Sequence, residues 1–189
     1  MPSKLRPHVL GIDDGAFTKG QRDPVPIVGV MMEGADLVEA IAVTEFPVDG
    51  AGATDFLADW VSNLRLHPTL QGIVLGGITI AGLGVVDLLA LATAVSTPVI
   101  AVTRRPTTDH RMREALDAAG LTERLETVER AEPAFRAEPG LYISHAGGER
   151  DAALQLVRAT QRKSKLPEPL RIAHLIAAAI SRGESRGRV

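Results

Sequence analysis

The sequence contains no cysteine among its 189 residues. That absence excludes a disulfide framework, a thiolate metal site and a cysteine nucleophile, and it favours a reducing compartment. Long apolar runs are missing as well: none approaches the roughly 18 residues that a membrane span needs, and the first residues lack a hydrophobic signal segment. We therefore expect a cytoplasmic protein with no membrane partner.

Net charge is also low, because 21 Lys and Arg residues stand against 23 Asp and Glu residues, which gives −2. The chain as a whole is no polycation, so a surface for nucleic acid would have to be local. Two local basic runs exist. Residues 158–189 hold eight Lys or Arg against two Glu, and residues 104–113 hold four Arg against one Asp. The candidate phosphate-binding residues in these runs are Arg104, Arg105, Arg182 and Arg186.

What is present is a chain long and apolar enough, at 45% hydrophobic residues, to bury one core. A single domain over residues 1–189 with a basic C-terminal helix and tail is expected. Hydrophobic patterning predicts strands at 9–12, 25–32, 37–46, 71–75, 98–102 and 141–144. It predicts helices at 53–66, 85–96, 109–119 and 149–163, and a final helix that ends near residue 182. Residues 123–138 are acidic and poor in apolar side chains, which indicates a peripheral excursion.

The order of these elements predicts an α/β fold. Three consecutive strands, the second and third joined by the tight connection at 33–36, are expected to be antiparallel, and the strand–helix units that follow favour parallel connections. The result is a mixed five-stranded sheet flanked by helices, which is the ribonuclease H-like pattern. A Rossmann fold would instead alternate strand and helix from the start.

The first predicted strand ends in two adjacent carboxylates, Asp13 and Asp14, followed by Gly15. Neighbouring residues on a strand point to opposite faces, so at most one of the two can enter a given site. An Asp-Gly pair can also be a simple turn signal, and that interpretation stays open. The third strand ends in the same way, at Asp49 and Gly50. On the expected sheet these ends meet, and clustered carboxylates would bind Mg²⁺ or Mn²⁺.

A glycine-rich turn follows the strand at 71–75 and could let a phosphate approach backbone N–H groups, although it matches neither the dinucleotide fingerprint nor the P-loop. Its candidate substrate-binding residues are Gly76, Gly77 and Thr79. His174 lies on the mostly apolar final helix. A lone histidine there is more often a packed boundary residue than a metal ligand, so both interpretations remain.

Several of these segments resemble the endonuclease dU family, which is similar in turn to endonuclease V, the deoxyinosine-directed repair nuclease. The resemblance spans essentially the full chain. It rests on Gly11-Ile-Asp-Asp-Gly15, Val48-Asp-Gly50, Gly77-Ile-Thr79, Pro98-Val-Ile-Ala-Val102 and Pro169-Leu-Arg-Ile-Ala-His-Leu-Ile176, with Gly183-Glu-Ser-Arg-Gly-Arg188. Its most specific parts, which follow the endonuclease V tail, are Leu141-Tyr-Ile-Ser144 and Lys165-Leu-Pro-Glu-Pro-Leu-Arg-Ile-Ala-His174.

The resemblance implies roles for four residues of a metal-dependent nuclease. Asp13 matches the metal-binding aspartate of the first strand, Asp49 the acidic residue after the third strand, and His174 the late histidine of the metal site. Arg104 falls where endonuclease V has a lysine near the scissile phosphate. These matches make Asp13, Asp49 and Arg104 the candidate catalytic residues, and Asp13, Asp49 and His174, with Asp14 beside them, the candidate metal ligands.

The chain departs from the family at two places. The fourth strand commonly ends in Asp-Gly in both families, whereas here it ends in Gly76-Gly77, so a central metal-binding carboxylate is missing. The aromatic and proline wedge that endonuclease V inserts at a lesion is replaced by residues 40–46. Deoxyinosine specificity is therefore not implied for this chain.

Two functions follow as hypotheses. The first is a metal-dependent endonuclease for damaged or deaminated DNA or RNA, with a metal shell altered at Gly76 and compensated by Asp14 or Asp87. The second is a ribonuclease H-like module that has lost catalysis and keeps a basic surface for nucleic acid. A nucleotide-binding phosphotransferase is a weaker third idea. The motif Gly-Ile-Asp-x-Gly also begins actin-like ATPases, but the chain lacks the second domain of those proteins.

Overall fold

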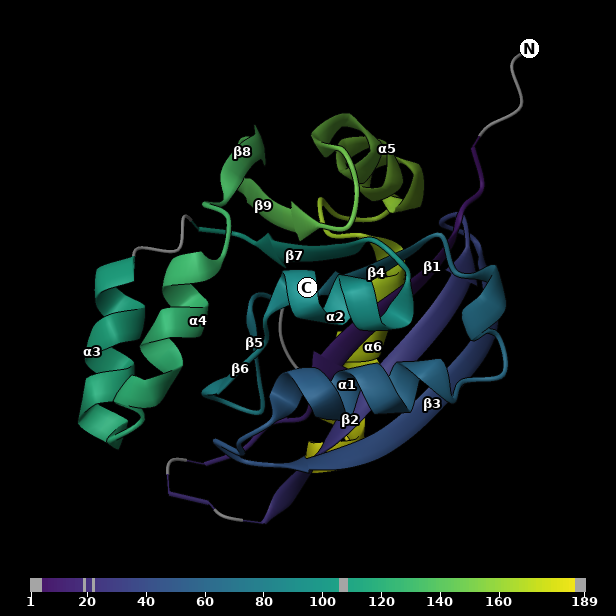
Figure 1. Ribbon diagram of the computed structural model, residues 1–189. Coiled ribbons are helices and arrows are strands. Elements are labelled where there is room, and N and C mark those ends of the chain that lie inside the picture. The colour runs from purple at the N-terminus through teal and green to yellow at the C-terminus, as the bar shows by residue number, and fades with distance from the viewer. Residues whose placement is uncertain (1–4, 19, 22, 106–108, 186–189) are drawn as a thin grey trace.

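A seven-stranded mixed sheet forms the centre of the computed structural model, which describes residues 5–18, 20–21, 23–105 and 109–185. Its strand order is β3-β2-β1-β4-β7-β9-β8 (Figure 1). The strands are β1 His8–Asp14, β2 Pro24–Glu33, β3 Leu37–Pro47, β4 Gly72–Leu75, β7 Val99–Thr103, β8 Phe135–Glu138 and β9 Leu141–Ala146. A separate hairpin pairs β5 Thr79–Ile80 with β6 Gly84–Val85.

The strand pairing confirms the predicted directions of the first five strands. β1, β2 and β3 pair antiparallel, whereas β1 with β4 and β4 with β7 pair parallel. The predicted sheet of five strands was wrong, because the sheet has seven: the strand predicted at 141–144 joins it as β9, antiparallel to β7, and the unpredicted β8 pairs antiparallel with β9. β8 lies in the segment 123–138 that was predicted as an excursion. A four-residue edge strand has a partner on one side only, so it needs little apolar character.

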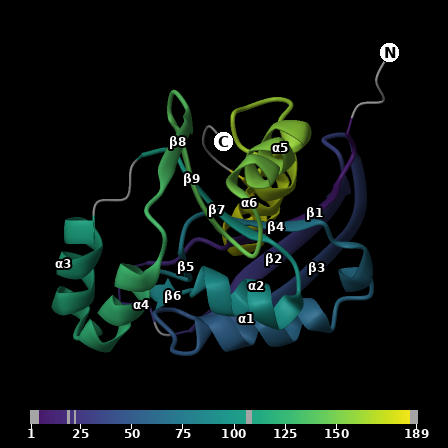
Figure 2. The same ribbon diagram turned by 45° about the horizontal axis from the view of Figure 1, so that its top comes forward.

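Helices cover both faces of this sheet. α1 Ala53–Ser62 and α2 Leu88–Val95 lie on one face, and α5 Arg150–Thr160 and α6 Glu168–Arg182 lie on the other, as Figure 2 shows. α3 Asp109–Ala119 and α4 Leu125–Arg130 pack together at the side, and the short 3-10 helices are η1 His67–Thr69 and η2 Thr122–Arg124. Within the described ranges, no helix is long and apolar enough to cross a membrane.

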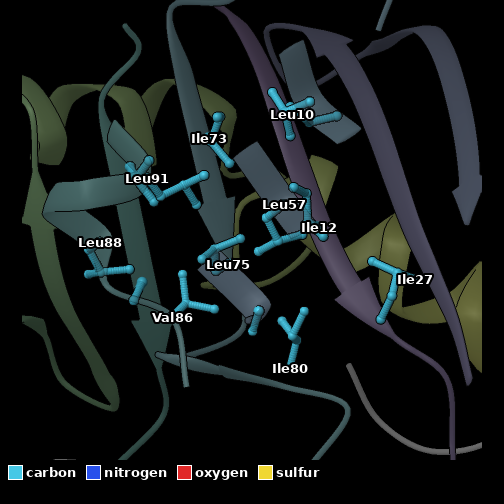
Figure 3. Close-up of a cluster of buried hydrophobic side chains, with 14 of the residues drawn as sticks. Leu10, Ile12, Ile27, Leu57, Ile73, Leu75, Ile80, Val86, Leu88 and Leu91 are labelled. Atoms are coloured by element: carbon cyan, nitrogen blue, oxygen red, sulfur yellow. The ribbon is translucent and has the colours of Figure 1, made fainter. Parts of the chain in front are cut away.

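The alternation of side chains along β1 divides the core into two layers. Leu10 and Ile12 are buried in the cluster between the sheet and α1 and α2 (Figure 3). Val9 is buried on the opposite face, in the cluster that includes Leu170 of α6. Because the strand period is two, Asp13 continues the α6 face and Asp14 continues the α1 and α2 face.

At two of the helix boundaries that differ from the predictions, polar side chains bond to the backbone. The helix predicted at 85–96 starts only at Leu88, since the Asp87 carboxylate accepts hydrogen bonds from the N–H groups of Leu89 and Ala90 at 3.0 Å each. The helix predicted at 53–66 ends at Ser62, and the Asn63 side-chain amide donates to the carbonyl of Asp59 at 2.7 Å.

Gly11 is the point where α6 comes closest to the sheet. A Cβ atom at Gly11 would lie 2.2 Å from both the backbone nitrogen of Leu170 and the carbonyl carbon of Pro169. Backbone atoms cannot move away as a flexible side chain can, so any side chain at this position would push the start of α6 off β1. The glycine therefore allows the short distance between the start of α6 and the sheet.

We expect Gly11→Ala to lower the free energy of unfolding by about 3 kcal/mol, because the added methyl group meets the backbone of Pro169 and Leu170. Gly148→Ala is the matched control, since its Cβ would lie 3.4 Å from the nearest atom, the Pro98 side chain. Urea denaturation measures both variants. Equal free energies of unfolding for Gly11→Ala and Gly148→Ala would contradict the close approach of α6 to Gly11.

Candidate functional site

A cleft of about 540 Å³ opens where β1, β4 and β7 end and α6 passes beside them. The residues that line it are Asp13, Asp14, Gly15, Ala16, Gly76, Val102, Arg104, Leu166, Leu170, His174, Ala178 and Arg182. The parallel strands β1, β4 and β7 all contribute from their carboxyl ends, which is where open α/β sheets commonly bind ligands.

Asp13 and His174 form a hydrogen-bonded pair in this cleft. His174 Nδ1 lies 2.7 Å from Asp13 Oδ2, and the Asp13 side chain is 17% exposed whereas that of His174 is 47% exposed. The hydrogen bond with Asp13 raises the pKa of His174, and the positive charge of Arg104 acts in the opposite direction. The pair can therefore hold a proton next to a cation at the cleft surface.

Asp14 also borders the cleft, and its carboxylate contacts the loop between β5 and β6. Its Oδ2 accepts a hydrogen bond from the backbone N–H of Ala81 at 2.5 Å, in the loop between β5 and β6. Burial raises the pKa of Asp14 to about 6, and the neighbouring charge of Asp13 adds to the shift. Both carboxylates line the cleft and interact with each other, but only Asp14 also bonds to the loop between β5 and β6.

Asp49 is not among the residues that line the cleft. Its Oδ1 accepts the backbone N–H of Leu83 at 2.8 Å, and its own N–H donates to the carbonyl of Ala81 at 2.8 Å. Arg124 completes this contact, because its guanidinium donates to the carbonyl oxygens of Asp49 at 2.9 Å and of Leu83 at 2.6 Å. Of the predicted trio, the cleft brings together Asp13 and His174, whereas Asp49 holds the loop between β5 and β6.

The other predicted site residues divide in the same way. Gly76, Arg104 and Arg182 line the cleft, and Gly77, Thr79 and Arg105 do not. Asp87, considered as a metal ligand that compensates for Gly76, instead accepts hydrogen bonds from the first backbone N–H groups of α2. Arg186 lies outside the described residues.

Arg124 joins the loop between β5 and β6 to Asp49 and was not among the predicted site residues. It lies in the segment that was predicted as an excursion, and a single arginine among glutamates there carries no local signal of its role. Its function depends on contacts with residues 75 and 41 positions away, which no short motif encodes.

The pKa of Asp14 predicts a pH-dependent stability. Its folded pKa, about 6, exceeds the ordinary value of 3.8, so the folded protein binds this proton more tightly than the unfolded chain does. The resulting contribution to the free energy of unfolding is fully present below pH 3.8 and is lost as pH rises through about 6. In the presence of EDTA, Asp14→Asn should match the wild type near pH 4, within about 0.5 kcal/mol, and exceed it on the order of 2 kcal/mol near pH 8.

Urea denaturation at the two pH values measures this difference. Asp59→Asn, an exposed carboxylate on α1, is the control and should show no such gain. A stability difference for Asp14→Asn that does not change between the two pH values would contradict the raised pKa.

Comparisons with known proteins place this geometry in context. The family model described as endonuclease dU matches residues 6–181. A UPF0215 protein of Methanothermobacter thermautotrophicus is 37% identical over 184 residues, which cover 95% of this chain and 90% of that protein. The UPF0215 protein of Methanopyrus kandleri is 38% identical over 184 residues, covering 94% and 93% of the two chains.

Two solved structures are similar to nearly the whole of this fold. A protein of unknown function from Archaeoglobus fulgidus superposes with a TM-score of 0.81 at 34% identity, covering 94% of this chain and all of that one. Endonuclease V of Ciona intestinalis, solved with a DNA that contains an inosine, gives a TM-score of 0.57 at 15% identity and covers 91% and 84% of the two chains. The fold is thus similar to that of endonuclease V, and the sequence match over residues 6–181 shows that the chain belongs to the endonuclease dU family.

Proposed function

We propose that this protein is a nuclease that hydrolyses phosphodiester bonds of damaged or deaminated nucleic acid in the cleft, with low activity. The observation that carries the proposal is the Asp13–His174 pair at 2.7 Å, which shares the cleft with Arg104 and Arg182. An acid–base pair beside two cations suits a reaction that moves a proton while negative charge develops on a phosphate. The family and the fold similar to endonuclease V support the same reaction.

The fold family implies a divalent cation, and the donors in the cleft fit one ion that is bound together with substrate. Among the described residues, no group of three or more His, Asp or Glu side chains is arranged to hold a metal. Asp13, with Asp14 beside it, remains as a carboxylate ligand at the cleft. Magnesium commonly uses one or two carboxylates plus substrate phosphates, so Asp13 with Asp14 would hold Mg²⁺ or Mn²⁺, while His174 keeps its ring nitrogens for proton transfer. When bound, the ion would supply electrophilic stabilisation of the phosphate.

The protein's own side chains have separate tasks in this proposal. Arg104 and Arg182 would bind the phosphate and neutralise its charge. His174, whose protonated form Asp13 stabilises through Nδ1, would donate the proton on Nε2 to the leaving oxygen, and the neutral imidazole could then accept a proton from water at Nε2. Asp13 would orient the ring through its hydrogen bond to Nδ1 and leave Nε2 for the substrate.

Gly76 supports the proposal of low activity. A Cβ at Gly76 would lie 3.1 Å from Asp13 Oδ1, so this position is where a carboxylate would stand beside Asp13. Gly76 is not among the residues with positive φ, and the other near atoms of a Cβ are side-chain atoms at 3.8 Å. A side chain therefore fits there with a small adjustment, and its absence removes a ligand and a negative charge.

The same observation favours the alternative of a binding module that has lost catalysis. The two functions separate when a carboxylate is restored. We expect Gly76→Asp to raise affinity for Mn²⁺ or Mg²⁺ and to increase cleavage by at least about tenfold, because a second carboxylate would face Asp13. Gly76→Asn, similar in size but uncharged, is the matched control and should show no gain.

The assay compares wild type, both Gly76 variants and Gly76→Asp combined with Asp13→Asn on inosine-containing, uracil-containing and undamaged single-stranded substrates. Loss of the gain in the double variant would support the nuclease. Strong wild-type cleavage that survives Asp13→Asn would refute the proposed roles of Asp13 and Gly76. Nucleic-acid binding without cleavage by any variant would favour the binding module over the nuclease.

A further inference from the structure

A second hollow of about 200 Å³ adjoins the cleft. Its lining residues, here called the side groove, are Arg104, Gly140, Leu141, Ser164, Lys165 and Leu166. Arg104 and Leu166 line both hollows, so the side groove continues the cleft away from His174. A strand whose phosphate lies at Arg104 could therefore extend in this direction.

Two separate loops form the walls of the side groove. One is the turn between β8 and β9, which contains Pro139 and Gly140, and the other is the connection between α5 and α6, which contains Ser164 and Lys165. The Lys165 ammonium donates a hydrogen bond to the carbonyl of Pro139 and so joins the walls. An ammonium has three donor hydrogens, which leaves two for a further acceptor.

Several contacts hold the connection between α5 and α6 in place. The Gln161 side-chain amide donates to Glu138 Oε1 at 2.9 Å and also to the carbonyl of Lys165. The Leu166 N–H donates to Ser164 Oγ at 3.2 Å, and residues Gln161 and Pro167 form a β-bridge. Because folding has already ordered this segment, a ligand there costs little further loss of conformational entropy.

We propose that the side groove binds a second phosphate of the nucleic-acid strand that occupies the cleft, with Lys165 and Ser164 as its contacts. The charged residues among the groove's lining residues are Arg104 and Lys165, both cations, and none of these lining residues is acidic. A continuous hollow that is cationic at both subsites fits a polymer with regularly spaced anions. The inference rests on the proposed function, because it assumes a strand in the cleft.

The test is fluorescence anisotropy of single-stranded oligothymidylates from dinucleotide to decanucleotide. Lys165→Gln should bind the decanucleotide about fivefold more weakly than wild type and lower the salt slope of binding by roughly 0.7, the value for one phosphate contact on a single strand. It should bind the dinucleotide as wild type does, since so short a ligand occupies the cleft alone. Lys165→Arg should retain affinity.

Lys163→Gln is the matched control, because it makes the same charge change on an exposed residue of the same connection and is not a lining residue of the groove. Equal affinities for Lys165→Gln and Lys163→Gln at every length would overturn the subsite, as would a loss that is the same for the dinucleotide and the decanucleotide. Arg104→Ala separates this failure from failure of the proposed function. If Arg104→Ala weakens binding while Lys165→Gln does not, only the side groove is refuted. If neither does, the strand does not enter the cleft.

Discussion

The close contact between Gly11 and the start of α6 is the constraint on which the site depends. The Pro169–Leu170 backbone lies directly against β1 at Gly11, and four residues later His174 stands on the same side of the helix as Leu170. Small residues extend this contact, because Ala173 and Ala177 pack against Val28 and Val30 of β2. His174 therefore reaches Asp13, which lies two residues beyond Gly11 on the same face of the strand.

A buried ion pair fixes the beginning of α6. The Glu168 side chain is 4% exposed, and its carboxylate accepts hydrogen bonds from Arg171 Nε and Nη2 and from the Lys163 N–H. These hydrogen bonds outweigh burial and lower the pKa of Glu168. Through the Lys163 N–H, the pair connects α6 to the segment that contains Ser164 and Lys165. The same ion pair therefore holds both α6 at the cleft and this wall of the side groove in place.

The cleft and the neighbouring loop between β5 and β6 also contain features that cost stability. Two neighbouring carboxylates, one of them largely buried, oppose each other electrostatically. Asp49 and Ala81 adopt positive φ values of 54° and 47°, which are uncommon for residues with a side chain. Hydrogen bonds among these residues and Arg124 hold the loop in this conformation. Such concentration of strain and charge at one edge of a well-packed sheet is common at functional sites.

Local sequence patterns were sufficient to predict the strands that are buried on both faces or alternate clearly, including β1 and β4. They failed at β8, where a four-residue edge strand has no apolar pattern. In the site, the expectation that Asp13 and His174 share one cleft came from the family resemblance, whereas strand alternation did not keep Asp14 out of that cleft. Asp49 follows an apolar strand just as Asp13 does, and only the tertiary position of the loop between β5 and β6 distinguishes their partners.

The five histidines of the chain provide a direct test of the claim that nucleic acid enters this cleft. His174 lines the cleft; His8 bonds to Glu39, His67 bonds to the Val95 carbonyl, and His110 and His145 also lie outside the cleft. NMR spectra of the imidazole rings, recorded while a single-stranded oligonucleotide is added, report all five positions in one experiment. If nucleic acid enters the cleft, the His174 resonances shift and those of the other four histidines remain. Resonances of His174 that stay unchanged at saturation, while binding is detected, would contradict this claim.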